Sequence, residues 1–371
     1  MDMEQGKKKP ARVRMKDIAE SLGISVNAVS LALNNKPGIG EETRQAILNI
    51  AHAMGYLETK EKFMRTYSST HLCVMMQKRY SEDLNFYGKV LIGVTEEARN
   101  RGFDAMVDFF DDSQSAVPKV VRDHRVAGII VIGKISDDNI TQLQGYHIPL
   151  VIVDHASLTR QADSILTDNK QGGFLITRYL LEKGLQRIGF FGDLDYSLSI
   201  KERFFGFFEA LYAQTGNRQR LYRDIERSSV LSNIEQYALK NDTAVIAKRL
   251  QELEQLPEAF VCSNDRAAIA VQLALESLGW RVPEDVSLTG FDDIDMCERI
   301  RPRLTTIRVN KEAMGRLAVQ RICHRIDHKS APFQNIVMSV ELIERESVKE
   351  ARAPRDSLPY SRKPMGEKPF L

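Results

Sequence analysis

The chain has 371 residues, a length that predicts two or three folded units. Hydrophobic residues make up 43% of it and charged residues 27%, the balance of a soluble globular protein, which excludes a collagen-like, coiled-coil or wholly disordered chain. The formal net charge is only +2, so the charge of the whole chain selects no class of partner.

Two features of the sequence bear on where the protein works. No stretch approaches the roughly 18 consecutive apolar residues that a membrane span needs, and residues 1–10 are polar with no apolar signal core behind them. The sequence therefore predicts a cytoplasmic protein. Cys73, Cys262, Cys297 and Cys323 show no paired spacing, which predicts reduced thiols rather than a disulfide framework.

The chain begins with a basic arm, which we bound at residues 1–13. Up to residue 16, six lysines and arginines face only two acidic residues. Basic tails are often simply solvated, so this arm indicates a polyanionic partner only if the neighbouring segment also requires one.

Residues 14–58 carry three short helical patterns, each with one apolar stripe. The stripes are Ile18, Ala19 and Leu22; Val26, Val29, Ala32 and Leu33; and Ala46, Ile47, Ile50, Ala51 and Met54. Gly23-Ile24-Ser25 separates the first two helices, with Ser25 at an N-cap position, and Gly40 stands where the third begins. This pattern predicts a helix-turn-helix unit, whose second helix can lie in the major groove of DNA.

Beyond a polar connector at residues 59–69, apolar strand-like runs alternate with amphipathic helices through residues 70–349. We expect strands at 72–76, 128–132, 150–153, 188–191, 259–262 and 286–289, and helices at 88–102, 171–183, 203–214 and 265–278. This alternation predicts parallel α/β sheets, and its length predicts two of them. Residues 350–371 contain prolines and scattered charges without an apolar period, so we expect a disordered tail.

Several blocks of the helical segment resemble a known family. They are Met15-Lys16-Asp17-Ile18-Ala19, Leu22-Gly23-Ile24-Ser25, Ala28-Val29-Ser30, Leu33-Asn34, Pro37-Gly38, Glu41-Glu42-Thr43-Arg44 and Gly55-Tyr56. They look like the DNA-binding headpiece of the lactose-repressor and galactose-repressor (LacI/GalR) family of bacterial transcription regulators. The resemblance implies that double-stranded operator DNA is the partner of this segment.

Position in the headpiece suggests roles for its exposed residues. Val26 and Asn27, at the start of the second helix, are placed to meet base edges, and an asparagine amide can bind adenine through two hydrogen bonds. The expected phosphate contacts, which fix register without reading sequence, are Ser25, Ser30, Asn34 and Arg44.

Two positions depart from the family pattern. Leu31 stands where the family usually has an arginine that can fork onto guanine, so we expect an operator less dependent on guanine there, with Leu31 against a thymine methyl group. Arg14 replaces a common threonine cap, which predicts a weaker cap and an added phosphate contact.

The connector at 59–69 occupies the place of the family's hinge helix, which enters the minor groove and inserts an apolar side chain between base steps. Phe63 and Met64 are the candidate wedge residues. The usual Pro-Asn and Ala-Arg residues are missing, and Glu61 suits a phosphate contact poorly. Two alternatives stay open: insertion into the groove, or a flexible linker whose Phe63 and Met64 pack on the larger domain.

The α/β segment continues the same resemblance in ordered blocks. Among them are Val126-Ala127-Gly128-Ile129-Ile130, Asp168-Asn169, Lys183-Gly184, Ser263-Asn264-Asp265, Gly290-Phe291-Asp292-Asp293 and Leu342-Ile343-Glu344-Arg345-Glu346-Ser347. The resemblance implies a small all-α helix-turn-helix headpiece followed by an α/β periplasmic-binding-protein-like core. That core has two Rossmann-like parallel-sheet lobes joined by three crossovers, with a small effector in the cleft.

The candidate effector-binding residues are Phe86, Tyr87, Asp154, Arg203, Asn264 and Asp292. The asparagine and the two aspartates follow strands, and ligands of open parallel sheets bind beyond the carboxyl ends of the strands. The arginine would add a forked donor, and the two aromatic residues a stacking face, for a polyhydroxylated ligand. The alternatives are ion pairing or helix capping for the polar residues and core packing for the aromatic ones.

Enzyme chemistry finds no support in the sequence. There is no Walker loop, nucleophile elbow or HExxH pattern, and Cys323, His324 and His328 lack a paired metal-ligand spacing. We therefore expect no catalytic residue, cofactor or metal, and instead a ligand-responsive, sequence-specific DNA-binding regulator: a homodimeric repressor that senses a sugar or sugar derivative. The alternative is a non-regulatory cytoplasmic solute-binding or sugar-modifying α/β protein.

Overall fold

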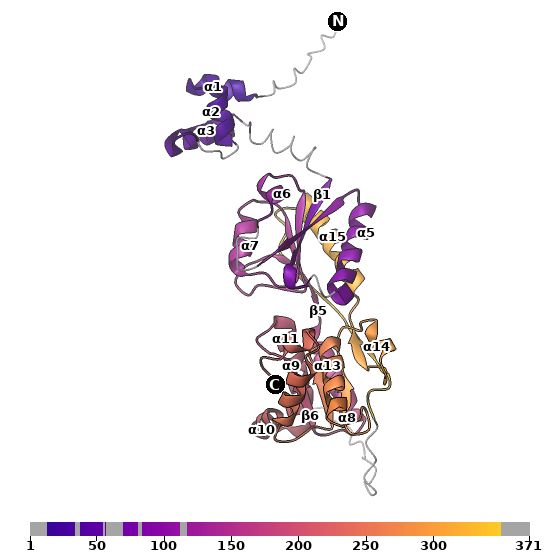
Figure 1. Cartoon of the computed structure of the whole chain (residues 1–371). Helices are drawn as coiled ribbons and strands as arrows, with labels where there is room; N and C mark the ends of the chain where they lie inside the picture. The colour runs from indigo at the N-terminus through magenta and orange to yellow at the C-terminus, as the bar shows by residue number, and fades with distance from the viewer. Residues whose placement is uncertain are drawn as a thin grey trace, which may run out of the picture.

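The computed structural model describes residues 13–33, 38–54, 56, 70–80, 84–111 and 117–349. The sequence predictions for most of the basic arm, for the connector at 59–69 and for the tail at 350–371 therefore fall outside the described residues. Figure 1 shows the described parts as a small helical headpiece and two α/β lobes.

The described part of the headpiece contains three helices where the apolar stripes predicted them: α1 (Met15–Leu22), α2 (Val26–Leu33) and α3 (Glu41–Ala53). The stripes meet in a core made of Ile18, Ala19, Val29, Ala32, Ile47 and Ala51. Gly23 ends α1 in the left-handed region, at φ 63°. The Ser25 hydroxyl then accepts the Ala28 N–H at 3.1 Å and caps α2, a bond worth about 1 kcal/mol. The predicted turn between the two helices is confirmed.

Lobe 1 is built on a six-stranded parallel sheet with the order β10-β5-β4-β3-β1-β2. Its strands are β1 (His71–Gln77), β2 (Asp104–Phe110), β3 (Gly128–Ile132), β4 (Leu150–Val153), β5 (Asp163–Thr167) and β10 (Asn335–Met338). One face packs against α5 (Lys89–Asn100) and α15 (Lys311–Asp327), and the other against α6 (Lys119–Arg122) and α7 (Asp137–Gln144). Two helical turns, η1 (Lys78–Tyr80) and η2 (Leu84–Gly88), precede α5.

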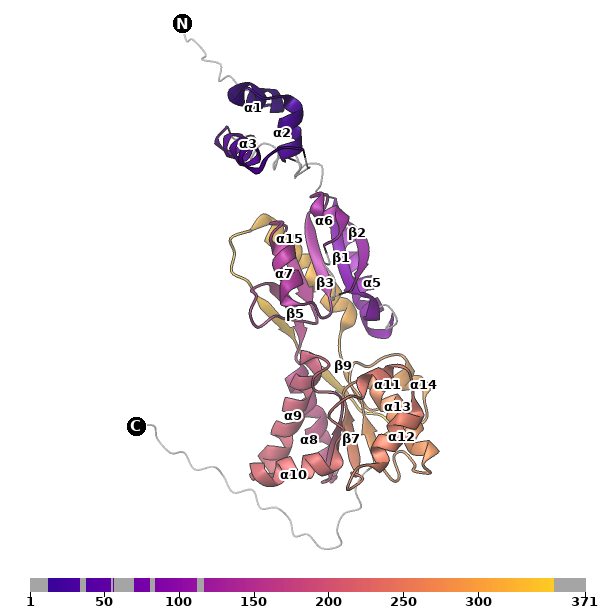
Figure 2. The same ribbon diagram turned by 60° about the vertical axis from the view of Figure 1, so that its left-hand side comes forward.

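Lobe 2 contains the parallel strands β6 (Ile188–Phe191), β7 (Ala259–Cys262) and β8 (Ser287–Thr289), and the antiparallel pair β9 (Thr306–Arg308) and β11 (Glu341–Ile343). Its longer helices are α8 (Asn169–Glu182), α9 (Leu198–Thr215), α10 (Arg218–Ser228), α12 (Thr243–Gln251) and α13 (Asp265–Ser277), and its short ones are α11 (Glu235–Leu239) and α14 (Met296–Arg299). Figure 2 shows α8 and α9 on one side of β7, and α12 and α13 on the other.

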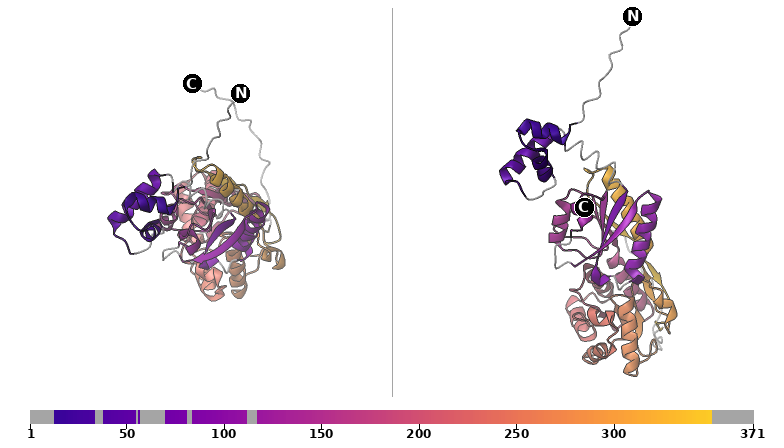
Figure 3. Two further views of the ribbon diagram at one scale, coloured as in Figure 1. Left: turned by 90° about the horizontal axis from the view of Figure 1, so that it is seen from above. Right: turned by 45° about the horizontal axis from the view of Figure 1, so that its top comes forward.

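Within the described residues, the chain crosses between the lobes at three places, as expected. β5 leads into α8, β9 leads into α15, and β10 leads into β11. Lobe 1 therefore receives its last helix and one strand from the end of the described chain, and the yellow α15 lies beside α5 in Figure 3. Because each crossing is short, the two lobes face each other across a narrow region.

The structure corrects the sequence prediction in two respects. The two expected parallel sheets are present, and lobe 2 has in addition a separate antiparallel pair, β9 and β11, that was not predicted. β2 and β5 were not predicted as strands. β2 is an edge strand whose Val107 and Phe109 are 40% and 44% exposed, and β5 begins with the buried pair Asp163 and Ser164, so neither reads as a continuous apolar run.

The cysteines and the helices agree with a protein that has neither disulfide bonds nor membrane spans in its described part. All four cysteines are free, and three of them are buried. Burial raises the pKa of the Cys73 thiol to about 12, which keeps this thiol protonated. Among the described residues, no helix combines the length and apolar character needed to cross a membrane.

Candidate functional site

The first turn of α2 presents the predicted base-reading residues to solvent. Val26 is 43% exposed, and Asn27 is exposed beside it. Val29 and Ala32, on the opposite side of the helix, are buried against α1 and α3. Because the buried side holds the helix in place, the exposed first turn can enter a groove without disturbing the headpiece core.

Two residues of the predicted DNA surface make contacts inside the headpiece. The Arg44 guanidinium donates to the carbonyls of Leu31 and Ala32, both at 3.4 Å, at the C-terminal end of α2 where a cation is favourable. The half-buried Leu31 side chain packs toward Gly38, since a β-carbon built on that glycine would lie 3.4 Å from Leu31 Cδ1. Only part of the Leu31 side chain is therefore left for the proposed thymine contact.

Arg14 occupies the N-cap position of α1 and is exposed. Its side chain makes no capping hydrogen bond, as expected from the loss of the family's threonine. The Asp17 carboxylate instead accepts the Arg14 N–H at 2.6 Å, which offsets part of that loss. Ser30 is half-buried on α2, and the remaining candidates, Asn34, Phe63 and Met64, lie outside the described residues.

The second candidate site is a cavity of about 550 Å³ between the two lobes, a volume in the range of small-molecule sites. All six predicted effector-binding residues line it: Phe86, Tyr87, Asp154, Arg203, Asn264 and Asp292. The first three come from lobe 1 and the last three from lobe 2. Asp154 directly follows β4, whereas Asn264 and Asp292 stand one and two residues further beyond their strands than predicted.

Arg203, on α9, is the best-anchored of these side chains. Its Nε donates to Asn169 Oδ1 at 2.9 Å, its Nη1 to the Ser263 carbonyl at 2.6 Å, and its Nη2 to Asp292 Oδ1 at 3.2 Å. The guanidinium also lies 3.7 Å from the centre of the Phe291 ring. Ion pairing and ligand binding are thus compatible here, because a guanidinium has five donors and three are used.

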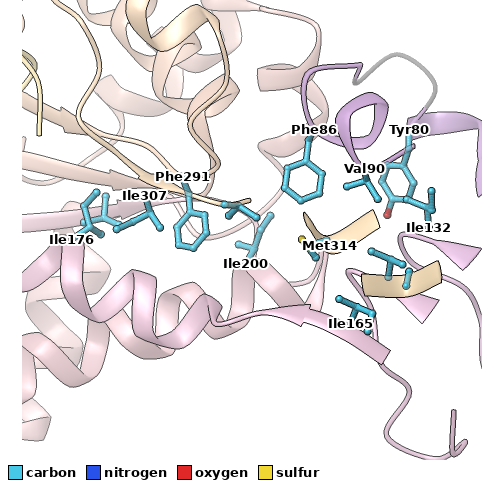
Figure 4. Packing of buried hydrophobic residues seen from close by; sticks show 14 of the residues in the cluster. Tyr80, Phe86, Val90, Ile132, Ile165, Ile176, Ile200, Phe291, Ile307 and Met314 are labelled. Atoms are coloured by element: carbon cyan, nitrogen blue, oxygen red, sulfur yellow. The ribbon is translucent and has the colours of Figure 1, made fainter. Parts of the chain in front are cut away.

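Close packing of two helices fixes the position of Arg203. A β-carbon at Gly173 of α8 would lie 2.1 Å from the Arg203 carbonyl oxygen, and one at Gly206 of α9 would lie 2.0 Å from the Lys170 carbonyl oxygen. Only glycine allows this approach of the two backbones. Figure 4 shows Phe291 and Ile200 of lobe 2 opposite Phe86 and Met314 of lobe 1 around the same region.

Asp154 and Asp292 share an uncommon backbone conformation. Their φ angles are 60° and 106°, in the region that L side chains rarely adopt. Such backbone strain is concentrated at functional sites, where the surrounding structure maintains it. Asp292 is held by Arg203 through its side chain and by Lys311, whose Nζ donates to the Asp292 carbonyl.

The carboxyl of Asp154 is held in an environment that favours its neutral form. Burial raises the pKa of Asp154 to about 7, with Arg203 opposing the rise and Asp292 adding to it. The Tyr87 hydroxyl donates to Asp154 Oδ2 at 3.1 Å. Near neutral pH this side chain is therefore both a possible donor and a possible acceptor for a ligand hydroxyl.

The aromatic candidates differ in their burial. Phe86 is only 4% exposed and packs edge-on to Tyr87, with ring centres 5.0 Å apart, so it contributes mainly to the core. Tyr87 is half-buried, and its ring centre lies 4.3 Å from that of Tyr80. Of the two aromatic candidates, Tyr87 is therefore the more exposed, and the predicted stacking role remains a prediction.

Asn264 combines capping with a place on the cavity wall. Its Oδ1 accepts the Ala267 N–H at 2.9 Å and caps α13, and its Nδ2 donates to Glu235 Oε2 at 3.2 Å. Glu235 is buried, and the Ser263 hydroxyl donates to it at 2.6 Å. Burial raises the pKa of Glu235, and Ser263 opposes the rise. The capping alternative is thus observed, and the amide still faces the cavity.

Sequence reasoning missed several residues that line the cavity. Arg79 and Lys134 closely follow β1 and β3, and the strand-end argument that found Asp154 would have found them. Glu235 had no such signal, because it belongs to a five-residue helix after an irregular segment. Among the described residues, no three histidine, cysteine or acidic side chains come together as ligands for a metal ion.

Comparison with known proteins places both parts of the chain. Residues 14–58 match the family model of bacterial regulatory proteins of the lacI family, and residues 177–348 match that of a periplasmic binding protein-like domain. One relative is the HTH-type transcriptional repressor PurR of Vibrio atlanticus, 29% identical over 342 residues, which are 90% of this chain and 98% of the relative. The PurR of Mannheimia succiniciproducens is 27% identical over 344 residues, with the same coverage of 90% and 98%.

Solved structures share the fold. A LacI family regulator from Enterococcus faecium with bound ribose has a TM-score of 0.65 at 22% identity, covering 76% of this chain and all of that one. The CelR–cellobiose complex has a TM-score of 0.62 at 21% identity, and the lac repressor dimer bound to operator and the anti-inducer ONPF has 0.61 at 20%; each covers 91% of this chain and all of its own. These proteins are regulators and not enzymes. The chain therefore combines a lacI-family helix-turn-helix headpiece with a periplasmic-binding-protein-like core, and it is a DNA-binding transcription regulator.

Proposed function

We propose that the protein is a ligand-responsive repressor that binds its operator as a homodimer and senses a sugar or sugar derivative between its lobes. The observation that carries the proposal is the cavity. All six residues predicted as effector contacts line this one cavity, and they come from both lobes. In this proposal residues 14–58 form the headpiece, residues 59–69 the hinge and residues 70–349 the effector-binding and dimerisation domain.

The chemistry of the cavity suits a polyhydroxylated ligand. Asp154, Asn264 and Asp292 offer acceptors and donors from different strand ends, and Tyr87 offers a ring face. Ribose and cellobiose occupy two structures of the same fold, which supports a sugar-like ligand here. The remaining donors of Arg203 would add direction to such binding, because a guanidinium is planar and fixed.

Coupling of the cavity to DNA follows from the chain path. A ligand that contacts both lobes favours one lobe arrangement, and it can shift the equilibrium only by its difference in affinity for the two arrangements. The headpiece joins lobe 1 just before β1, so the two headpieces of a dimer would change their spacing when lobe 1 moves. Whether the ligand releases or strengthens DNA binding depends on which arrangement has the operator spacing.

A homodimer is supported by an uncovered edge of lobe 1. β2 is the edge strand of the sheet, and three of its apolar residues, Met106, Val107 and Phe109, are about two-fifths exposed. Ile92, on the neighbouring α5, is 50% exposed. Exposed apolar edge strands are usually covered in natural proteins. A second copy placed there would also supply the second headpiece that a two-fold operator needs.

The proposal is tested by gel shift on selected operator DNA, with the full chain and with a chain lacking residues 1–66. The full chain is expected to bind one sequence specifically and to lose this when the headpiece is removed. A thermal-shift panel of sugars, sugar phosphates and nucleobases then identifies ligands, because a ligand that binds the folded state raises the melting temperature. Equal operator affinity with and without a saturating cavity ligand would contradict the proposed response.

The base-reading role of Asn27 has a matched control in the same headpiece. Asn27→Ala is expected to weaken binding to the selected operator by about 1–3 kcal/mol, roughly 5- to 150-fold, because it removes a paired contact with one base. Asn49→Ala, at an exposed position of α3 whose amide contacts Gln45, should leave affinity unchanged. An unchanged affinity in Asn27→Ala would remove this residue from base reading.

A further inference from the structure

Two cationic residues of the cavity lining follow neighbouring strands of lobe 1. Met76 of β1 is paired with Ile132 of β3 in the parallel register, so the chain leaves both strands at the same edge of the sheet. Arg79 follows β1 and Lys134 follows β3, and both line the cavity. The topology of the sheet therefore places a guanidinium and an ammonium group at neighbouring strand ends.

The ring of Tyr80 holds this arrangement together. Arg79 Nη2 donates to the Tyr80 hydroxyl at 2.6 Å, and its guanidinium lies 4.7 Å from the centre of that ring. The ring itself packs on Gly133, where a β-carbon would lie 2.4 Å from it. Because Gly133 directly precedes Lys134, the contact fixes the backbone of Lys134 beside the residue that orients Arg79.

The described carboxylates of the lining are already engaged elsewhere. Asp292 pairs with Arg203, Asp195 with Lys201, and Asp137 accepts the hydroxyls of Ser157 and Thr159. Among the residues that the structure describes, neither Arg79 nor Lys134 forms an ion pair with a carboxylate. Glu82 and Asp83, which follow Arg79 closely in the chain, lie outside those residues, so the comparison of charges covers the described lining alone.

The two remaining acidic groups of the lining are both shifted toward their neutral forms. Burial raises the pKa of Asp154 to about 7, so this carboxyl is mainly neutral below that pH. Burial also raises the pKa of Glu235. The cavity thus combines cations that have no carboxylate partner among the described residues with carboxyl groups whose pKa values are raised, and both features favour an anionic ligand.

Lobe 2 contributes a feature of the same sign opposite Arg79. The Tyr196 ring centre lies 5.3 Å from the Arg79 guanidinium, and the next residue, Ser197, is the N-cap of the 18-residue helix α9. The hydroxyls of Ser197 and Ser199 lie 2.8 Å apart at this helix start and line the cavity. The start of a long helix carries partial positive charge and exposed N–H groups that suit an anion.

We propose that the effector carries a phosphomonoester, held by Arg79 and Lys134 of lobe 1 and by the start of α9 in lobe 2, while its hydroxyl groups face Arg203, Asp154 and Asp292. This inference rests on the proposed effector site and names the chemical class of its ligand. A phosphate in this position contacts both lobes at once. Its charge would therefore strengthen ligand binding and would also favour the lobe arrangement in which both lobes reach it. A sugar phosphate and a nucleoside monophosphate share this chemistry.

The test measures ligand affinity of the full-length protein by titration calorimetry and thermal shift. The probes are matched pairs with and without phosphate: sugars and their phosphate esters, nucleosides and their monophosphates, and inorganic phosphate alone. The variants are Arg79→Gln and Lys134→Gln, with Lys119→Gln on α6, outside the cavity lining, as the control. Operator binding without ligand checks that each variant is folded.

We expect the wild-type protein to bind one phosphate ester at least tenfold more tightly than its phosphate-free partner. Each cavity variant should lose about 10- to 100-fold of that affinity, as one charge-assisted hydrogen bond is worth about 1.5–3 kcal/mol. Inorganic phosphate should raise the melting temperature of the wild type and of Lys119→Gln more than that of the cavity variants. The matched pair of probes that shows this difference in affinity distinguishes a sugar phosphate from a nucleoside monophosphate.

Two results would overturn the inference while leaving the proposed regulator intact. One is a neutral sugar that controls operator binding as well as its phosphate ester does and binds normally to both cavity variants. The other is a phosphate response that is equal, or equally absent, in wild type and cavity variants. Failure of the regulatory proposal looks different, because then a bound ligand of any charge leaves operator affinity unchanged.

Discussion

Both lobes of the core bury guanidinium groups against carboxylates, and the centres at Asp163 and at Arg203 differ in what surrounds them. In lobe 1, the fully buried Asp163 accepts Arg321 Nε at 2.9 Å and Arg325 Nε at 2.7 Å. In lobe 2, the buried Arg203 pairs with Asp292 at 3.2 Å. Burial and bonding are similar, yet only the lobe 2 centre lines the cavity.

The position of each centre along the strands explains the difference. Asp163 is the first residue of β5, at the amino end of a parallel strand, and its arginines also donate to the carbonyls of Ala331 and Pro332. Asp292 stands beyond β8, at the carboxyl end. Ligands of parallel sheets bind at the carboxyl ends, so the end of the strand, rather than burial, separates a structural ion pair from a candidate ligand contact.

The largest effect that this comparison predicts is on the stability of lobe 1. Asp163→Ala leaves Arg321 and Arg325 buried without their carboxylate, and should lower the free energy of unfolding by about 3–5 kcal/mol. Urea unfolding followed by circular dichroism measures the change. Asp104→Ala, at an exposed position of β2, is the control and should cost less than about 1 kcal/mol. Equal losses in the two variants would show that the lobe 1 centre is not structural.

A smaller effect, on ligand binding rather than folding, is expected in lobe 2. Arg203→Lys keeps the charge but removes the planar fork that reaches Asn169, Ser263 and Asp292 at once. We expect effector affinity to fall about 10- to 100-fold while operator affinity without effector is retained. Arg178→Lys, on the exposed side of α8, should change neither. Normal effector affinity in Arg203→Lys would make the two buried centres alike in function.

The smallest effect concerns the pH dependence that the cavity imposes on stability. Asp154 has a raised pKa of about 7 in the folded protein, against an ordinary value of 3.8. Between about pH 4 and 7 the folded state therefore binds more protons than the unfolded state, and stability falls as the pH rises. In Asp154→Asn this fall should be shallower. Part of the fall in stability should remain in this variant, because burial also raises the pKa of Asp265.

Unfolding in urea at several values between pH 5 and 8 tests this expectation. The curve of Asp154→Asn should approach or exceed that of the wild type as the pH rises. Asp285→Asn is the control, because the pKa of Asp285 is lowered by Arg281 and its contribution lies below this pH range. Parallel curves for Asp154→Asn and wild type would show that ionisation of Asp154 does not lower the free energy of unfolding.

Much of this architecture could be predicted because buried parallel strands appear in the sequence as continuous runs of apolar residues. The segments that became β1, β3, β4, β6 and β7 have this form. The polar residues after β4 and β7 led to Asp154 and Asn264, and the predicted strand at 286–289 led to Asp292. The Asp163 centre could not be predicted, since its partners lie 158 and 162 positions further along the chain. Glu235 was hidden for the same reason, because only the folded path brings it to Ser263 and Asn264.

The order in which the chain visits the lobes has a consequence for its synthesis. The face of the lobe 1 sheet that holds Val74, Ile130 and Val151 is completed by Met314, Ala318, Val319 and Ile322 of α15. A ribosome makes all of β6 to β9 before it makes that helix, so a nascent lobe 1 carries an open apolar face throughout the production of lobe 2. Stalling or cleavage before residue 311 should therefore leave an aggregation-prone fragment, although lobe 1 is the lobe whose first strands are made first.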